Sequence, residues 1–344
     1  MSRFKVTSLG VGSLPHKDPA SALELIFRNF SELLFWPQLP KRDMREGMVM
    51  QFSEKMPYLK LKKEGLSFDS EYPEQELEVF YEKVIANDAE YFKISDNFAL
   101  GLHELYRRLE STDIKGIEFI KCQVTGPFTF AAAINDDNGR ALLHNRLFFQ
   151  AAAKALALKA AWQIKLFKRF GKKIILFFDE PYLGCFGSAY TPVNREEVIN
   201  VYSELAGSLK AEGALIGVHC CGNTDWSMLA EVDSIDMLNF DAFDYQERFI
   251  LYAESLKSFL KRKGMICWGI VPAGEKAKEI SPASLAGRLK SGMDALVKKG
   301  LDRDLLRERL FISPACGLGT LEVSLAEKVL KLLNDTATYL QKNP

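Results

Sequence analysis

The sequence has no net charge, because its 45 Lys and Arg residues are balanced by 45 Asp and Glu residues. Without a net field, neither nucleic acid nor an anionic membrane surface is an expected partner. No apolar run approaches the length of a membrane span, and the first residues contain no unbroken hydrophobic core of a signal peptide. We therefore predict a soluble, cytoplasmic protein.

The sequence also has no low-complexity tract and no linker rich in Pro, Ser or Gly. Its 344 residues, 47% of them hydrophobic, are enough for one large core, so we expect one domain over residues 1–344. Six cysteines in so long a chain, without a secretory signal, indicate reduced thiols and not a disulfide framework. They are Cys122, Cys185, Cys220, Cys221, Cys267 and Cys316.

Short apolar runs rich in β-branched and aromatic residues recur along the chain, and helical patterns follow most of them. Such alternation predicts a parallel sheet covered by helices, and eight repeats predict a single (β/α)8 TIM barrel of the α/β class. The runs are Val6–Leu14, Glu32–Gln38, Phe119–Thr125, Ile174–Asp179, Leu215–Cys221, Met237–Asp241, Ile266–Val271 and Leu310–Ala315.

Helix starts are marked by Asp18-Pro19, Asn194 and Ser281-Pro282, which place a capping residue before a first helical turn. The segment of about 41–116 is too long for a simple crossover and contains helical patterns at Glu74–Lys93 and Phe98–Leu109. We expect a helical insertion after the second strand, forming a lid or wall at the barrel mouth.

One stretch, IGVHCCGNTDW, places a histidine and two cysteines where a buried strand should end. Because side chains alternate along a strand, His219 and Cys221 should face one side and Cys220 the other. Imidazole and thiolate both suit zinc, but a site needs more than two ligands. Cys316 ends another strand and is the natural third ligand, while Asp241, on the neighbouring strand, could be a fourth.

Catalytic groups of a (β/α)8 barrel lie at the carboxyl ends of its strands, so these positions are candidates for binding substrate. These positions include Gly12, Ser13, Gln38, Asp179 and Glu180, which we expect to bind substrate. Asp179 and Glu180 could instead cap the following turn. The remaining groups are expected to be core or surface residues: Cys122, Cys185, Cys220, Cys267, His103 and His144.

Four motifs together resemble the catalytic half of cobalamin-independent methionine synthase, in the superfamily that includes uroporphyrinogen decarboxylase. They are GVGSLPH near the start, Asp-Glu-Pro at 179–181, His-x-Cys at 219–221 and PACGLGT at 314–320. The resemblance implies zinc bound by His219, Cys221 and Cys316, with Asp241 in place of the family's glutamate. It also implies a methyl transfer to the thiol of homocysteine. In that reaction Gly12-Ser13 would correspond to the family's substrate-binding element and Asp179 to its amino-group-binding aspartate, which makes Ser13 and Asp179 the predicted catalytic residues.

Several family features are missing from this chain, and all of them concern folate and the amino-acid end. The 344 residues have room for only one of the two barrels of folate-using members; Trp36-Pro37-Gln38 replaces His-Gly-Glu; Val271–Glu275 has no histidine; and Gly126–Asn135 lacks the tryptophan against which the pterin packs. We therefore expect a methylated corrinoid protein as donor and a homocysteine-like thiol as acceptor.

Zinc would present the acceptor as a thiolate at neutral pH, where a free thiol, with a pKa of about 8.5, is mostly protonated. Two other functions remain open from the sequence. One is transfer from a corrinoid protein to coenzyme M, which would need a basic group for the sulfonate. The other is a non-catalytic barrel that binds a thiol or a tetrapyrrole-like ligand.

Overall fold

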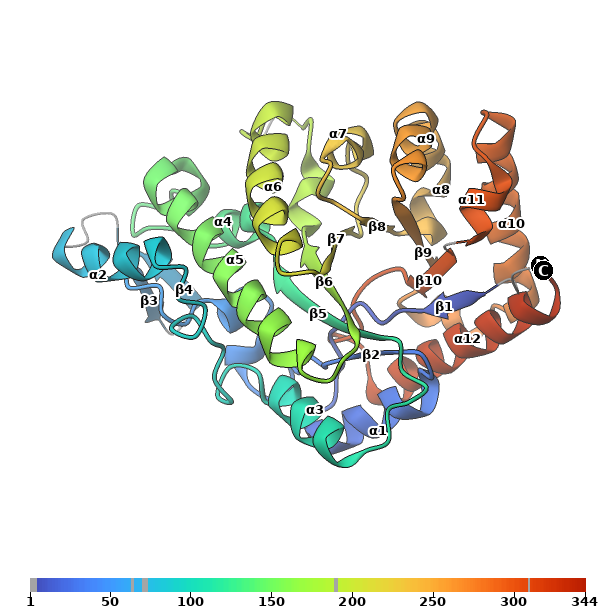
Figure 1. Cartoon of the computed structure of the whole chain (residues 1–344), viewed down its shortest axis with the longest axis horizontal. Helices are drawn as coiled ribbons and strands as arrows, with labels where there is room; N and C mark the ends of the chain where they lie inside the picture. The colour runs from blue at the N-terminus through green and yellow to red at the C-terminus, as the bar shows by residue number, and fades with distance from the viewer. Residues whose placement is uncertain (1–4, 63–64, 70–73, 189–190, 309) are drawn as a thin grey trace.

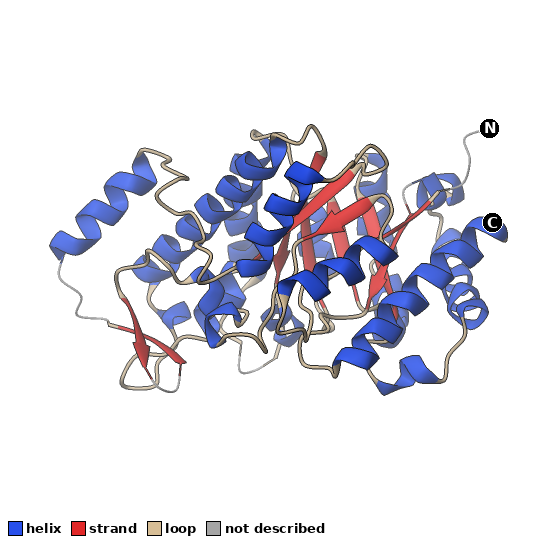
Figure 2. Ribbon diagram, turned by 90° about the horizontal axis from the view of Figure 1, so that it is seen from below, coloured by secondary structure: helices blue, strands red, loops and turns tan. Residues whose placement is uncertain are grey.

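The structure is a computed structural model that describes residues 5–62, 65–69, 74–188, 191–308 and 310–344. Eight parallel strands form one sheet in the order β1-β10-β9-β8-β7-β6-β5-β2, and helices surround it (Figures 1 and 2). The strands are β1 Val6–Ser8, β2 Leu33–Phe35, β5 Phe119–Thr125, β6 Lys173–Asp179, β7 Leu215–Cys220, β8 Met237–Phe240, β9 Met265–Val271 and β10 Leu310–Pro314. Each coincides with one predicted run, and the predicted (β/α)8 barrel is confirmed.

The barrel is nearly closed, since β1 and β2 are the two ends of the hydrogen-bonded order. Their extensions meet only near the mouth, where Ser13 forms an isolated parallel bridge with Gln38. The amide of Leu14 donates to the carbonyl of Gln38 (2.9 Å), and the amide of Gln38 donates to the carbonyl of Gly12 (3.1 Å). This bridge brings the segments after β1 and β2 together at the carboxyl ends of the strands.

The helices that cover the sheet begin at the predicted caps. The carboxylate of Asp18 accepts from the amide of Ser21 (2.9 Å). Asn194 and Ser281 likewise cap the helices that begin directly after them. The helices are α1 Pro19–Asn29, α2 Glu74–Ile85, α3 Leu100–Ser111, α4 Pro127–Ala132, α5 Arg146–Lys168, α6 Arg195–Lys210, α7 Trp226–Glu231, α8 Ala242–Ile250, α9 Ala253–Lys261, α10 Pro282–Lys298, α11 Arg303–Glu308 and α12 Val323–Lys342.

The insertion contains two helices near the predicted positions, α2 and α3, and also an antiparallel hairpin that was not predicted, β3 Leu59–Lys62 and β4 Gly65–Phe68. Helix α3 packs against α1 and serves as the crossover into β5. Helix α2 and the hairpin stand at one side of the barrel in Figure 1. That residues 1–344 form one domain stays a prediction.

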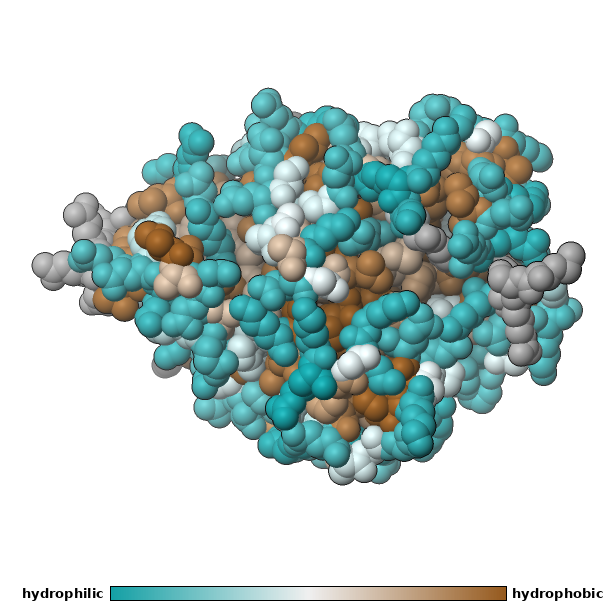
Figure 3. Space-filling view, viewed as in Figure 1, coloured by the Kyte–Doolittle hydropathy of each residue, from teal (hydrophilic) through white to brown (hydrophobic). Residues whose placement is uncertain are grey.

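The core has an inner and an outer part. Inside the barrel, side chains such as Phe177, Met237 and Phe311 form one cluster, while a larger cluster lies between sheet and helices. The barrel is thus filled below its mouth. On the face seen in Figure 3, hydrophilic residues cover most of the helices. No helix among the described residues has the length and hydrophobicity to cross a membrane.

Candidate active site

Three of the four side chains predicted to bind metal lie together at the barrel mouth. Ligand atoms of His219, Cys221 and Cys316 are all within 4.8 Å of one another. His219 is the last but one residue of β7, and Cys221 directly follows the strand. Cys220, the last residue of β7, is fully buried on the other side with its thiol toward the carbonyl of Gly222 (3.7 Å). Cys316 arrives from the loop after β10.

The imidazole of His219 is fixed in one orientation by Asn239, its register partner on β8. The Asn239 amide nitrogen donates to the carbonyl of Cys267 (3.0 Å) and to the hydroxyl of Ser313 (2.9 Å), so its oxygen faces the ring. Nδ1 of His219 therefore donates to Oδ1 of Asn239 (2.6 Å). Nε2 carries the lone pair, and it is buried without a hydrogen-bond partner. This is the arrangement of a metal-binding histidine held by a second residue.

The two thiols differ in acidity although they are neighbours. The hydrogen bond from Cys221 lowers the pKa of the Cys316 thiol, and the same bond raises the pKa of Cys221. Cys316 is thus the thiol that ionises first. A donor set of one neutral imidazole nitrogen and two cysteine sulfurs fits zinc and leaves a further coordination position for another ligand.

A cavity of about 370 Å³ opens directly over this cluster. Among the described residues that line it there is no Lys or Arg; the acidic groups are Asp179 and Glu46. Ser13, Gln38 and Asp179, three of the predicted substrate-binding residues, reach it. The other lining residues are Val11, Pro40, Met48, Pro181, His219, Cys221, Cys316, Gly317, Gly319 and Thr320.

Asp179 ends β6, level with His219 on β7. Its side chain is buried, and Oδ1 has no hydrogen-bond partner. Burial raises the pKa of this carboxyl to about 6, against the opposing effect of the Lys121 ammonium. Asp179 can therefore be ionised at neutral pH and accept hydrogen bonds from a cationic group in the cavity.

Ser13 is held against the loop after β10. Its hydroxyl oxygen accepts from the amide of Gly319 (3.2 Å), and a Cβ at Gly317 would lie 2.3 Å from that oxygen. Gly12 has φ +148°, and a Cβ there would lie 2.9 Å from Oε1 of Gln38. Gly12 lies behind the cavity wall and makes room for the side chains that reach the cavity.

Asp241 has a different position from the three clustered ligands. It is the N-cap of α8, where its Oδ1 accepts from the amide of Asp244 (2.9 Å), and burial raises its pKa to about 6. It is not a member of the 4.8 Å cluster. A role for Asp241 as fourth ligand stays a prediction. Because Oδ1 caps the helix, the other carboxylate oxygen would have to bind the metal.

Glu180 does not reach the cavity, although we predicted that it binds substrate. Its carboxylate is fully buried and accepts from the amides of Phe128 (3.1 Å) and Thr129 (2.8 Å), the Thr129 hydroxyl (2.6 Å) and the Tyr202 hydroxyl (2.8 Å). As Asp179 faces the barrel interior, its strand neighbour faces outward. Glu180 holds the start of α4 in place.

Replacing Glu180 by glutamine should destabilise the protein by about 2–3 kcal/mol. Each carboxylate oxygen accepts from one backbone amide, so the NH2 group of the new side chain would face an amide hydrogen in either orientation. Urea denaturation measures the change. Glu247→Gln, at an exposed position of α8, is the control and should shift the free energy of unfolding by less than about 0.5 kcal/mol. Equal stability of the two variants would contradict this role.

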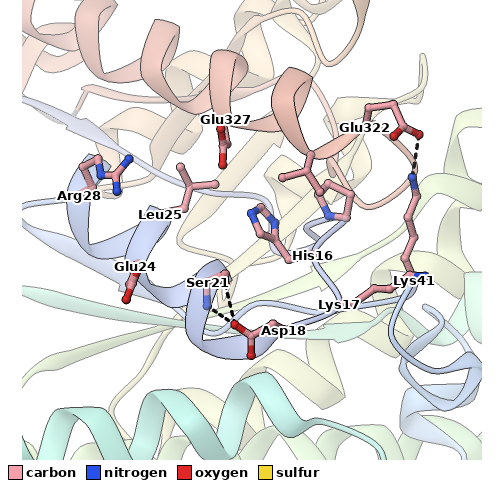
Figure 4. Close-up of a pocket in the computed structure, with 12 residues that line it drawn as sticks. His16, Lys17, Asp18, Ser21, Glu24, Leu25, Arg28, Lys41, Glu322 and Glu327 are labelled. Atoms are coloured by element: carbon pink, nitrogen blue, oxygen red, sulfur yellow. Dashed lines mark hydrogen bonds and ion pairs between the residues drawn. The ribbon is translucent and has the colours of Figure 1, made fainter.

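A second, larger groove of about 750 Å³ lies between α1 and α12 (Figure 4). His16, from the GVGSLPH motif, is buried there with Nδ1 unpartnered. Its charged lining residues are of both signs, among them Arg28, Lys41 and Glu327. His219, Cys221 and Cys316 line the smaller cavity and not this groove, so the smaller cavity is the candidate site.

Some residues of the site were not predicted from the sequence. Asn239 was among the strand-end positions but had no role assigned, although its register beside His219 follows from the strand order. Pro40, Glu46 and Met48 come from the insertion and line the cavity. They lie in a long, irregular segment without a regular sequence pattern, so the sequence did not indicate that they line the cavity. The start of the insertion is thus a wall of the site.

Similar structures were found at low identity. A zinc-containing IolI protein is 16% identical, with 78% of this chain and 93% of that chain covered, at a TM-score of 0.41. The C-terminal domain of a putative chitinase from Desulfitobacterium hafniense DCB-2 is 11% identical, with 97% and 99% covered, also at 0.41. Similarity at this level gives no information about the function of this chain. No curated protein sequence matches it.

The family comparison is informative, because it covers more than half of the chain. The model of the catalytic domain of cobalamin-independent synthase matches residues 110–339, which contain β5 to β10 and the clustered side chains of His219, Cys221 and Cys316. The predicted resemblance is thereby confirmed, and the chain belongs to the family of the cobalamin-independent synthase catalytic domain.

Proposed function

We propose that the protein is a zinc-dependent methyltransferase that methylates the thiol of a homocysteine-like acceptor. The observation that carries this proposal is the unpartnered Nε2 of His219, buried beside the thiols of Cys221 and Cys316. A buried nitrogen without a partner costs free energy unless a ligand completes it. When bound there, zinc would lower the pKa of an acceptor thiol, so that it is nucleophilic at neutral pH.

The cavity residues orient the acceptor. Asp179 offers a buried carboxylate oxygen without a partner to an ammonium group, and Ser13 offers a hydroxyl in the same cavity. Val11, Pro40, Met48 and Pro181 exclude water around the reacting sulfur. Because reacting groups held in place react far faster than free ones, these contacts would supply much of the rate.

The charges of the cavity favour this acceptor over coenzyme M. A sulfonate would need a cation, yet no Lys or Arg is among the described lining residues, and Asp179 would repel it. An amino-acid thiol places its ammonium near Asp179 instead. The donor would reach the sulfur through the open side of the cavity, and we propose a methylated corrinoid protein because the folate features are missing from the sequence.

Zinc-edge X-ray absorption of the zinc-loaded protein tests the proposal. Adding homocysteine should add one sulfur to the zinc shell, whereas coenzyme M at the same concentration should not. An unchanged shell with homocysteine would contradict the enzyme and support a non-catalytic barrel. A new sulfur with coenzyme M alone would favour the second methyltransferase.

Replacing Asn239 by leucine should weaken zinc binding by about 10–100-fold, as loss of a partner of a metal-binding histidine does. The change removes the acceptor for Nδ1 of His219 and frees the ring to turn. Competition with a chromophoric chelator measures the affinity. Leu238→Ala, next in the strand and buried in the outer core, is the control and should leave zinc affinity unchanged. Equal loss in both variants would contradict the role of Asn239.

A further inference from the structure

A buried lysine inside the barrel has so far been mentioned only for its effect on the pKa of Asp179. Lys121, on β5, is 1% exposed and lies beneath the cavity. Its ammonium donates to the carbonyl of Val11 (2.6 Å) and to Oε1 of Gln123 (3.0 Å), and it lies 5.3 Å from the ring centre of Phe177. Among the described residues, no carboxylate lies within ion-pair distance of it.

Lys121 acts at the gap in the barrel. Between β1 and β2 the ladder is missing up to the bridge at Ser13 and Gln38. Side chains of β5 take its place: Lys121 bonds the carbonyl of Val11, on the β1 side, while Nε2 of Gln123 bonds the carbonyl of Trp36 (2.9 Å), on the β2 side. The bond between Lys121 and Gln123 joins these two contacts.

A second set of hydrogen bonds connects Trp36 to the main chain of Gln123 through Gln163. The indole of Trp36 donates to Oε1 of Gln163 (2.9 Å), whose Nε2 donates to the carbonyl of Gln123 (3.1 Å). All these groups are buried. The side-chain amide of Gln123 itself is held by two bonds, from its Nε2 to the carbonyl of Trp36 and to its Oε1 from Lys121, so the ammonium of Lys121 is kept between Gln123 and Val11.

We propose that Lys121 is a positioning residue of the thiol site, holding Gly12 and Ser13 in place through the carbonyl of Val11. A buried ammonium without a carboxylate partner is costly. A methionine of similar length would fill the space without that cost, but it could not bond Val11. This inference rests on the proposed function, since Ser13 matters only if the cavity binds an acceptor.

The test compares two buried lysines. Lys121→Met in zinc-loaded protein should weaken homocysteine binding at least tenfold by calorimetry, with zinc content unchanged. Lys159→Met is the matched control, because Lys159 is fully buried in α5 and donates to Phe92 far from the cavity wall. Its homocysteine affinity should stay within twofold. Lys121→Arg keeps a hydrogen-bond donor, so its homocysteine affinity should be closer to that of the unmodified protein than the affinity of Lys121→Met.

Hydrogen–deuterium exchange separates this inference from the proposed function. Amides of residues 9–16 should exchange faster in Lys121→Met but not in Lys159→Met, whether or not a thiol binds. If the unmodified protein binds no homocysteine, the proposed function fails and exchange alone decides the role of Lys121. Unchanged exchange of residues 9–16 in Lys121→Met would overturn the inference. If Lys121→Met does not fold, the same measurement is made on Gln123→Met, with the same criterion.

Discussion

Cys316→Ala and Cys221→Ala should each lose zinc, with a loss of affinity beyond the ~100-fold that removal of a supporting partner causes. Each removes one of the three donors that cluster among the described residues, and two donors are too few for a zinc site. Zinc content after dialysis against a weak chelator, together with circular dichroism to verify folding, measures the effect.

The neighbouring cysteine provides the control for this experiment. Cys220 precedes Cys221, is fully buried and lies on the opposite side of β7. Cys220→Ala should keep its zinc, because its thiol is directed toward Gly222 and away from the cluster. If Cys220→Ala loses zinc as completely as Cys221→Ala, or if neither change affects zinc, the assignment of the ligands is wrong.

Asp179→Asn should reduce homocysteine affinity by about 10–150-fold while zinc stays bound. The change removes a buried negative charge whose bond to an ammonium is worth about 1.5–3 kcal/mol, and about 1.4 kcal/mol corresponds to a tenfold change. The amide that replaces it also directs hydrogens at the ammonium in one of its two orientations. Calorimetry with zinc-loaded protein measures the difference.

A thiol without the amino group shows whether the lost affinity belongs to that contact. 4-Mercaptobutanoate should bind Asp179→Asn at least as well as the unmodified protein, because the acid has no ammonium to pair and its carboxylate no longer meets a negative charge. A parallel loss for both thiols would mean that Asp179 acts on the metal-binding side chains and not on the amino group.

Most of the barrel could be predicted because its strands are continuous apolar runs bounded by polar strand ends. Such runs occur where a parallel sheet is covered on both faces. The hairpin β3–β4 escaped prediction, since its strands have four residues each and the LKLK strand is largely exposed. A short, solvated hairpin leaves little hydrophobic pattern in a sequence.

The site was predictable where strand alternation was applied. Alternation separated Cys220 from Cys221, and the same rule places Asp179 and Glu180 on opposite faces, although we did not apply it there. Lys121 could not be found in this way. A lysine inside an apolar run gives no sign that its ammonium bonds a carbonyl more than a hundred residues away.

The separation along the chain of the side chains proposed to bind metal has a thermodynamic consequence. Cys221 follows β7 and Cys316 follows β10, with two strands between them in the sheet and nearly a hundred residues between them in sequence. An ion bound to both would act as a cross-link, and closing a loop of that length removes conformational entropy from the unfolded chain worth about 4–5 kcal/mol. Metal occupancy would thus also set how firmly the last strand is held in the barrel.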